Sequence, residues 1–279
     1  MICETIKLEV PYEKYECKKI GKPAVLNTYI LRDYPHNHIV KMRPAVIICP
    51  GGGYEHVSER EAEPVAVQFN AMGYHAFVLN YSVKGEGIYP APMLELAKAV
   101  LTVRENAENW HIDKNKVLVC GFSAGGHLAA YLGTCYEEDY LSEAFQVTSE
   151  ALRPDGIILS YPVITSGEYA HRESFENLLG DRYQELVESV SLEKRVTKNT
   201  PKTFLWTTMT DDTVPVENSL MLISAYRKEG VSMEAHLFPA GRHGMSICTE
   251  ETSVKSDKSD INEACQAWIP LVRKWMEEF

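Results

Sequence analysis

Strand-like segments alternate with helical ones from residue 44 onward, and this alternation limits the fold of the 279-residue chain more than any other feature. A short apolar run bounded by glycine or proline is typical of a strand buried on both faces. The segments expected to form such central strands are 44–50, 74–81, 116–121, 155–162, 203–209 and 233–239. Strands separated by helices form a mostly parallel sheet with helices on both faces. We therefore expect a single α/β domain over residues 1–279.

The remaining segments complete this expected architecture. Residues 6–10 and 24–31 read as two early strands that pair with each other. The expected helices lie at 62–72, at 93–110, from the end of strand 116–121 to about 133, at 215–229 and at 261–279, the last with a kink at Pro270. Residues from about 163 to 200 fit no core pattern, so we expect them to form a small cap insertion over the carboxyl ends of the strands.

One strand runs directly into Gly121-Phe122-Ser123-Ala124-Gly125. In a strand–turn–helix context, GxSxG places the serine on a sharp turn, where flanking glycines remove side chains that would collide. The hydroxyl is then raised above the sheet, close to the amide groups of a helix N-terminus. The pattern alone also occurs by chance, so its position after a buried strand favours a nucleophile over a plain turn.

A nucleophilic serine needs a base, and the base needs an acid that orients it. His243 follows the last expected strand and lies in a glycine-flanked loop, which favours it as the base. Asp211 and Asp212 follow strand 203–209. We favour Asp211 as the acid and expect Asp212 to cap the helix near Pro215 or to interact with its dipole, and Asp212 stays open as an alternative acid. Among the other histidines, we expect His127 to pack on its own helix, and His36 and His38 to lie at the surface.

The triple glycine in Pro50-Gly51-Gly52-Gly53-Tyr54 follows another buried strand. Glycines at such a place let the backbone approach a substrate and present N–H groups to an oxyanion. Gly52, Gly53 and the amide of Ala124 are therefore the expected oxyanion-hole donors. The Gly-Lys-Ser/Thr that would follow in a phosphate loop does not occur here.

Charge and cysteine usage exclude several other classes of function. The net charge of −11 disfavours nucleic acid or an anionic membrane as a partner. Seven scattered cysteines, with no CxxC pair, indicate neither a metal site nor a disulfide framework. No apolar run reaches membrane-spanning length, and the N-terminus lacks the features of a signal peptide. We expect a cytoplasmic protein that needs no metal or organic cofactor, and the sequence leaves a homo-oligomer open.

Taken together, the motifs resemble the α/β-hydrolase superfamily over nearly the whole chain. Within it, the chain is similar to serine esterases related to hormone-sensitive lipase, in particular the acetyl xylan and feruloyl esterases. The residues that carry this resemblance are PGGGY (50–54), residues 58–83, YPAPMLEL (89–96), residues 110–134, DDTVPVENS (211–219) and GRHG (241–244).

The resemblance implies hydrolysis of short acyl esters, above all acetyl groups on small-molecule or oligosaccharide carbohydrates. Lipase relatives usually carry a histidine before the three glycines, and Pro50 at this position is familiar in the carbohydrate-esterase group. Tyr54, His56 and Arg60, together with the cap segment, are the expected wall of the substrate pocket.

Two other classes of protein share part of this pattern. A serine peptidase of the prolyl-oligopeptidase type has the same order of catalytic residues, but it usually carries a large N-terminal gating domain, and only about 40 residues precede residue 44. A non-catalytic hydrolase-fold protein typically loses a catalytic residue or an oxyanion glycine, whereas this chain retains the full set. We therefore expect a serine esterase.

Overall fold

The computed structural model describes residues 1–15, 17, 23–33, 40–83 and 88–279. In these residues an eight-stranded sheet has the order β1-β2-β4-β3-β5-β6-β7-β8. β2 pairs antiparallel with both β1 and β4, and the pairs from β4 across to β8 are parallel. The strands are β1 (Thr5–Lys7), β2 (Val25–Tyr29), β3 (Arg43–Cys49), β4 (His75–Asn80), β5 (Ile112–Phe122), β6 (Gly156–Ser160), β7 (Thr203–Thr208) and β8 (Met233–Phe238).

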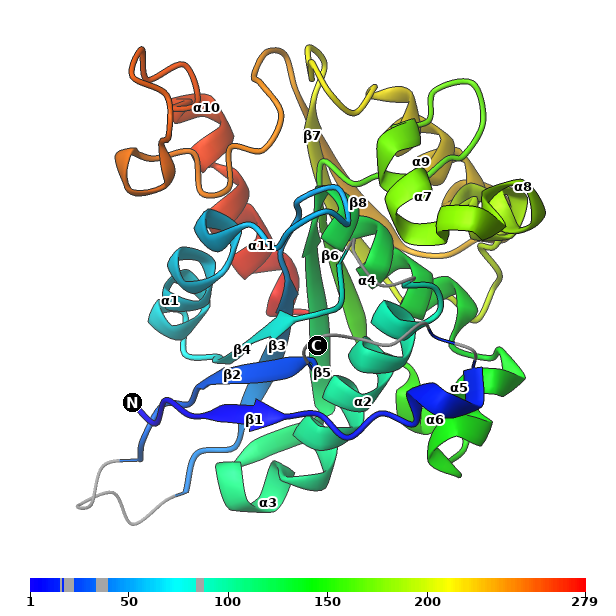
Figure 1. Cartoon of the computed structure of the whole chain (residues 1–279). Coiled ribbons are helices and arrows are strands. Elements are labelled where there is room, and N and C mark those ends of the chain that lie inside the picture. The colour runs from blue at the N-terminus through cyan, green and yellow to red at the C-terminus, as the bar shows by residue number, and fades with distance from the viewer. Residues whose placement is uncertain (16, 18–22, 34–39, 84–87) are drawn as a thin grey trace.

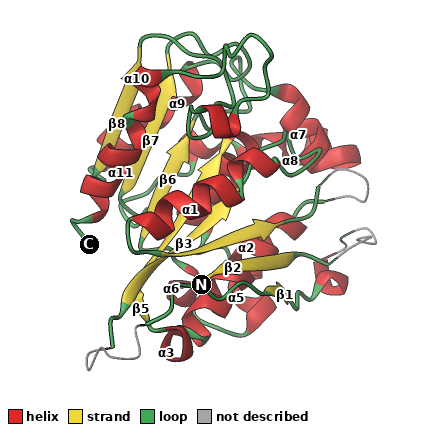
Figure 2. Ribbon diagram, turned by 90° about the vertical axis from the view of Figure 1, so that its left-hand side faces the viewer, coloured by secondary structure: helices red, strands yellow, loops and turns green. Residues whose placement is uncertain are grey.

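Helices cover both faces of this sheet, as Figures 1 and 2 show. α1 and α11 lie on one face, whereas α2, α4 and α9 lie on the other. The α-helices are α1 (Glu63–Ala71), α2 (Ala91–Glu105), α3 (Ala107–Trp110), α4 (Ser123–Cys135), α5 (Asp139–Phe145), α6 (Ser149–Leu152), α7 (Arg172–Leu179), α8 (Tyr183–Leu186), α9 (Glu217–Glu229), α10 (Glu263–Gln266) and α11 (Trp268–Met276). The expected mostly parallel sheet between two helical layers is confirmed.

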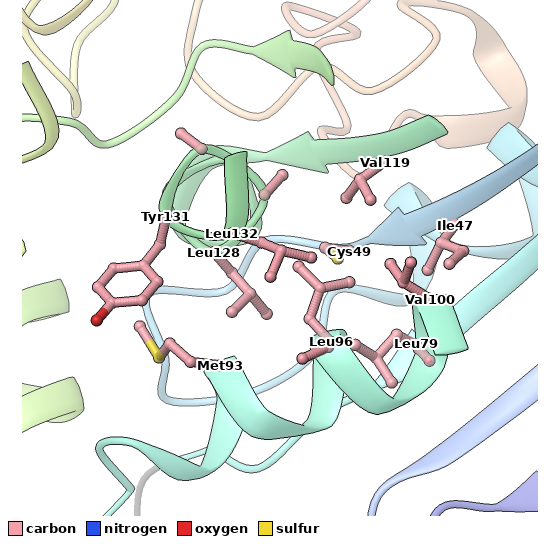
Figure 3. Close-up of a cluster of buried hydrophobic side chains, with 14 of the residues drawn as sticks. Ile47, Cys49, Leu79, Met93, Leu96, Val100, Val119, Leu128, Tyr131 and Leu132 are labelled. Carbon is pink, nitrogen blue, oxygen red and sulfur yellow. The ribbon is translucent and has the colours of Figure 1, made fainter. Parts of the chain in front are cut away.

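The central strands feed two separate cores because successive side chains point to opposite faces of a sheet. In β3, Ile47 and Cys49 belong to the core under α2 and α4, whereas Val46 and Ile48 belong to the core under α1 and α11. Figure 3 shows the first core, with side chains of α2 and α4 converging on β3 and β4. Burial on both faces explains why these strands read as continuous apolar runs.

Several boundaries differ from the sequence-based expectation. The single helix expected at 93–110 is two helices, because α2 ends at Glu105 and α3 follows. The expected kink at Pro270 is wrong: the last helical segment is interrupted at Ala267, and Pro270 lies in the first turn of α11. A proline there loses no intrahelical hydrogen bond, so it does not bend the helix. The short helices α5 and α6 were not expected.

The segment at 163–200 connects β6 to β7 and contains α7, α8 and three 3₁₀ turns (Gly180–Arg182, Val187–Val190 and Leu192–Lys194). It lies beside α4 and α9, at the upper right of Figure 1. Asn177 of α7 donates a hydrogen bond of 2.9 Å to the carbonyl of Gly53, in the loop after β3. The segment therefore contacts the carboxyl end of the sheet. In the part of the chain that the structure describes, no helix is both long and apolar enough to span a membrane.

Candidate active site

Ser123 occupies a turn that only glycine neighbours permit. It is the first residue of α4, directly after β5, and its φ of 52° lies in the left-handed region. A Cβ at Gly121 would lie 2.2 Å from the Gly125 carbonyl oxygen, and one at Gly125 would lie 2.1 Å from the Cys49 carbonyl oxygen. Because no side chain fits at these distances, the GxSxG glycines let the start of α4 pack against the end of β3.

Three side chains from distant loops form a continuous hydrogen-bonded row at this end of the sheet. His243 Nε2 lies 2.8 Å from Ser123 Oγ, and His243 Nδ1 lies 2.8 Å from Asp211 Oδ2. The other carboxylate oxygen, Oδ1 of Asp211, accepts the backbone N–H groups of Thr213 and Val214 at 3.0 and 2.8 Å. These two bonds fix the carboxylate, which in turn orients the imidazole toward the hydroxyl.

Asp212 has a different position from its neighbour. Its carboxylate accepts the backbone N–H of His243 at 3.2 Å and Nε of Arg242 at 3.1 Å. Although partial burial acts in the opposite direction, these bonds lower the pKa of Asp212. The expectation that Asp212 caps the helix near Pro215 is wrong, since α9 has no side-chain cap. Asp212 holds the backbone of the histidine loop instead, and Asp211 holds the ring.

The triple-glycine loop lies directly against Ser123. A Cβ at Gly51 would lie 2.9 Å from Ser123 Cβ, and the φ values of Gly52 and Gly53 are 119° and 63°. The N–H groups of Gly52 and Gly53 have no hydrogen-bond acceptor among the described residues. Ala124 lies in the first turn of α4, where backbone N–H groups lack intrahelical acceptors. All three expected donors thus lie in the two segments that meet at Ser123.

The expected pocket wall needs correction at Tyr54. This side chain is fully buried, and its hydroxyl lies 2.9 Å from Nδ1 of the buried His127. Its φ of 56° turns the chain after Gly53 so that the ring enters the core. His56 is exposed on the same turn. His127 packs on its helix as expected, whereas His36 and His38 lie outside the described residues.

Arg60, another residue of the expected pocket wall, forms an ion pair. Its guanidinium donates to Asp260 Oδ2 at 3.2 Å and to the Thr252 carbonyl at 3.3 Å. It therefore joins the segment after the glycine loop to the 252–260 loop. Its Nη2 lies 2.9 Å from where a Cβ on Gly244 would be, so the paired guanidinium adjoins the residue after His243.

The cap segment adds polar residues that no sequence motif indicates. His171 Nδ1 lies 2.9 Å from Ser174 Oγ, and this hydroxyl lies 3.8 Å from where a Cβ on Gly53 would be. Burial, and next the nearby His243, lower the pKa of His171. None of these residues belongs to a recognisable motif, so only the fold reveals that they adjoin the glycine loop.

Left-handed backbone conformations concentrate around Ser123. Non-glycine residues with positive φ include Tyr54, Ser123, Tyr161, Ser246 and Cys248, all in segments at or near the carboxyl end of the sheet. Such conformations cost about 1–3 kcal/mol each and are typical of functional sites. In contrast, no cluster of three or more His, Cys, Asp or Glu side chains suited to a metal ion occurs in the described ranges.

A mostly parallel sheet lies between helical layers, and a serine at a strand–helix turn is hydrogen-bonded to a histidine that is in turn hydrogen-bonded to an aspartate. This combination defines an α/β-hydrolase. The BD-FAE family model matches residues 33–226. The chain belongs to the BD-FAE family, and its resemblance to esterases of this superfamily is confirmed.

Relatives and solved structures agree with this assignment. The chain is 38% identical over 224 residues to an endo-1,4-beta-xylanase B of Butyrivibrio fibrisolvens, and 31% identical over 212 residues to an acetylxylan esterase of Xylanibacter ruminicola. These matches cover 78% and 74% of this chain but only 35% and 42% of those proteins. An acetyl ester-xyloside bifunctional hydrolase from Caldicellulosiruptor lactoaceticus has a similar structure, with a TM-score of 0.82, 38% identity, and coverage of 99% of this chain and 96% of the other.

Proposed function

We propose that the chain is a serine carboxylester hydrolase that removes short acyl groups, in particular acetyl groups, from carbohydrate substrates. The observation that carries the proposal is the pair of 2.8 Å contacts that join Asp211 to His243 and His243 to Ser123. Nucleophile, base and orienting acid have this mutual geometry in serine hydrolases of unrelated folds.

In the proposed acylation step, Ser123 Oγ attacks the ester carbonyl carbon while His243 Nε2 takes the hydroxyl proton. Asp211 keeps the proton of the neutral imidazole on Nδ1 and stabilises the imidazolium that forms. The bond to the leaving alcohol then breaks, and the alcohol oxygen receives the proton from Nε2. Water hydrolyses the acyl-enzyme by the same steps in reverse, with His243 again as base.

The negative charge on the carbonyl oxygen needs donors that are in place before the reaction. We assign this role to the N–H groups of Gly52, Gly53 and Ala124, since the glycine N–H groups lack acceptors and all three lie in the segments that meet at Ser123. One well-placed donor stabilises such a transition state by about 3 kcal/mol. Gly51 is not available for this role, because its N–H donates to Glu61 Oε2 at 2.8 Å.

The substrate class rests on the relatives and on the chemistry of the cap. Two of the similar proteins are named for acetylated xylan or an acetyl ester and xyloside. His171 and Ser174 add hydrogen-bonding groups beside the glycine loop, as recognition of an alcohol rich in hydroxyl groups would require. Because the curated relatives are much longer than the matched region, the activity of the whole protein is part of this proposal.

A panel of substrates tests the proposal. We expect turnover of 4-nitrophenyl acetate and acetylated xylo-oligosaccharides to exceed that of octanoyl and feruloyl esters, with no cleavage of a dipeptide anilide. Ser123→Ala should lower kcat by about 10⁴-fold or more while its thermal unfolding stays close to wild type. An unchanged rate in this variant, or faster cleavage of the anilide than of any ester, would refute the assignment.

A further inference from the structure

Glu61 is a buried carboxylate that none of the steps above uses. It ends the 3₁₀ turn Glu59–Glu61, and only 3% of its surface is exposed. Its Oε2 accepts the N–H of Gly51 at 2.8 Å, and its Oε1 accepts the hydroxyl of Tyr161 at 2.6 Å. The two oxygens thus connect the glycine loop after β3 with the residue that follows β6.

Both carboxylate oxygens of Glu61 act as hydrogen-bond acceptors. Ser246 donates its backbone N–H to the Tyr161 hydroxyl oxygen at 2.9 Å, so the Tyr161 proton is available for Glu61. Gly51 N–H is only a donor. Neither contact asks the Glu61 side chain to donate, which matches the acceptor-only hydrogen bonding of a carboxylate. No ion pair involves Glu61 among the described residues, and the neighbouring Arg60 bonds to Asp260.

Tyr161 links Glu61 to the loop that carries His243. Its ring meets the His243 imidazole edge-to-face, with centroids 4.9 Å apart and planes at 68°. Tyr161 and Ser246 have φ values of 39° and 54°, and the hydrogen bond between them helps hold both conformations. Ser246 Oγ also donates to the Arg60 carbonyl at 2.7 Å. The same carboxylate thus holds the loop beside Ser123 and the aromatic face that supports His243.

We propose that Glu61 is a positioning residue for ester hydrolysis, whose charge aligns the oxyanion loop with the His243 imidazole and favours the imidazolium that forms during acylation. This inference deepens the proposed function and rests on it. Glu61 acts through Gly51 and Tyr161 and does not touch the reacting atoms. The structure provides a matched control in Glu95, which is fully buried in α2.

Glu95 has almost the same hydrogen bonds at a different place. Its carboxylate accepts the backbone N–H of Ser82 at 2.6 Å and the hydroxyl of Tyr12 at 2.8 Å, and it also accepts the hydroxyl of Ser82 at 2.5 Å. Like Gly51, Ser82 lies just after a parallel strand. Tyr12, unlike Tyr161, has no ring contact with a histidine in the described structure. The two glutamates therefore share burial, a backbone N–H donor and a tyrosine donor, but only Glu61 is linked to His243.

The test compares Glu61→Gln and Tyr161→Phe with Glu95→Gln and Tyr12→Phe, using 4-nitrophenyl acetate from pH 5 to 9. For Glu61→Gln we expect kcat to fall by about 30-fold, with KM within about threefold of wild type. The acid limb of kcat/KM should also move to lower pH by at least about half a unit, because a negative charge near the imidazole is lost. Tyr161→Phe keeps the charge, so kcat should fall without that shift.

Both control variants should keep kcat within about twofold of wild type even where their thermal unfolding temperature drops. An equal loss of kcat in Glu61→Gln and Glu95→Gln, or an unmoved acid limb in Glu61→Gln, would overturn the proposal. If Glu61→Gln does not fold, an unchanged kcat in Tyr161→Phe would overturn it as well. Wild-type turnover by Ser123→Ala would refute the esterase mechanism itself, which separates that failure from this one.

Discussion

Two histidines, one inside α4 and one in the loop after β8, have hydrogen-bond partners at both ring nitrogens. The first is a buried structural residue, whereas the second is the proposed catalytic base. His127 lies between the Tyr54 hydroxyl and the Val190 carbonyl, each 2.9 Å away. His243 lies between the Asp211 carboxylate and the Ser123 hydroxyl, each 2.8 Å away. Full hydrogen bonding therefore does not distinguish a structural histidine from a candidate base.

The partners assign the two rings to opposite tautomers. A carbonyl only accepts, so His127 carries its proton on Nε2 and accepts the Tyr54 hydroxyl proton at Nδ1. A carboxylate also only accepts, so neutral His243 carries its proton on Nδ1 and leaves the lone pair of Nε2 facing Ser123. Burial lowers the pKa of His127 to about 4. The position of the acceptor-only partner decides which nitrogen can act as a base.

The largest predicted effect separates the two histidines directly. His243→Gln should lower kcat for an acetate ester by about 10⁴-fold, because the proposed base is lost. His127→Gln should keep kcat within about tenfold, because it removes only a packing and hydrogen-bonding group near the glycine loop. Steady-state kinetics on both variants measure these losses, and circular dichroism verifies that both variants fold. Comparable losses of kcat would contradict the different roles assigned to the two histidines.

The next effect concerns the two neighbouring aspartates. Asp211→Asn should lower kcat by about 10³–10⁴-fold, because an amide can donate to Nδ1 and favour the wrong tautomer. Asp212→Asn should lower kcat by less than about fivefold, because Asp212 bonds to the loop backbone and to an exposed arginine. If Asp212→Asn proves the more damaging change, Asp211 is not the orienting acid.

A third prediction concerns stability. Unfolded His127 takes up a proton near pH 6.5, whereas the folded ring stays neutral down to about pH 4. The unfolded state therefore binds more protons in this window, and stability falls by up to roughly 3 kcal/mol as the pH drops through it. Urea unfolding between pH 4.5 and 7.5 should show that the free energy of unfolding declines less steeply with falling pH in His127→Gln than in wild type. Some decline should remain in the variant, because burial also lowers the pKa of His75, which is present in both proteins. Parallel declines would contradict the lowered pKa of folded His127.

The smallest expected effect concerns a cap histidine with a hydrogen-bond partner at one ring nitrogen. His171 bonds to Ser174 through Nδ1, and its Nε2 has no partner among the described residues. His171→Ala should raise KM for an acetylated xylo-oligosaccharide by about fivefold and leave kcat for 4-nitrophenyl acetate unchanged, because only the carbohydrate offers hydroxyl groups to it. A change of the same size with both substrates would indicate a general packing role.

Local patterns predicted most of the backbone and the order of the proposed catalytic groups. Apolar runs indicated the central strands, because burial on both faces leaves no room for polar residues in them. GxSxG indicated the sharp turn, because side chains at Gly121 and Gly125 would collide with backbone atoms. The positions of Asp211 and His243 followed from the strands before them, and the structure brings these residues together with Ser123.

Only the tertiary structure decided where several singled-out side chains point. Tyr54 turns into the core, Arg60 pairs with a loop about 200 positions away, and Asp212 holds a backbone instead of capping a helix. Glu61 resembles an ordinary solvated charge in the sequence. It becomes a buried bridge because β3 and β6 bring Gly51 and Tyr161 to the same end of the sheet. Sequence pattern encodes which backbone conformation each segment prefers, whereas hydrogen bonds between distant segments depend on how those segments pack.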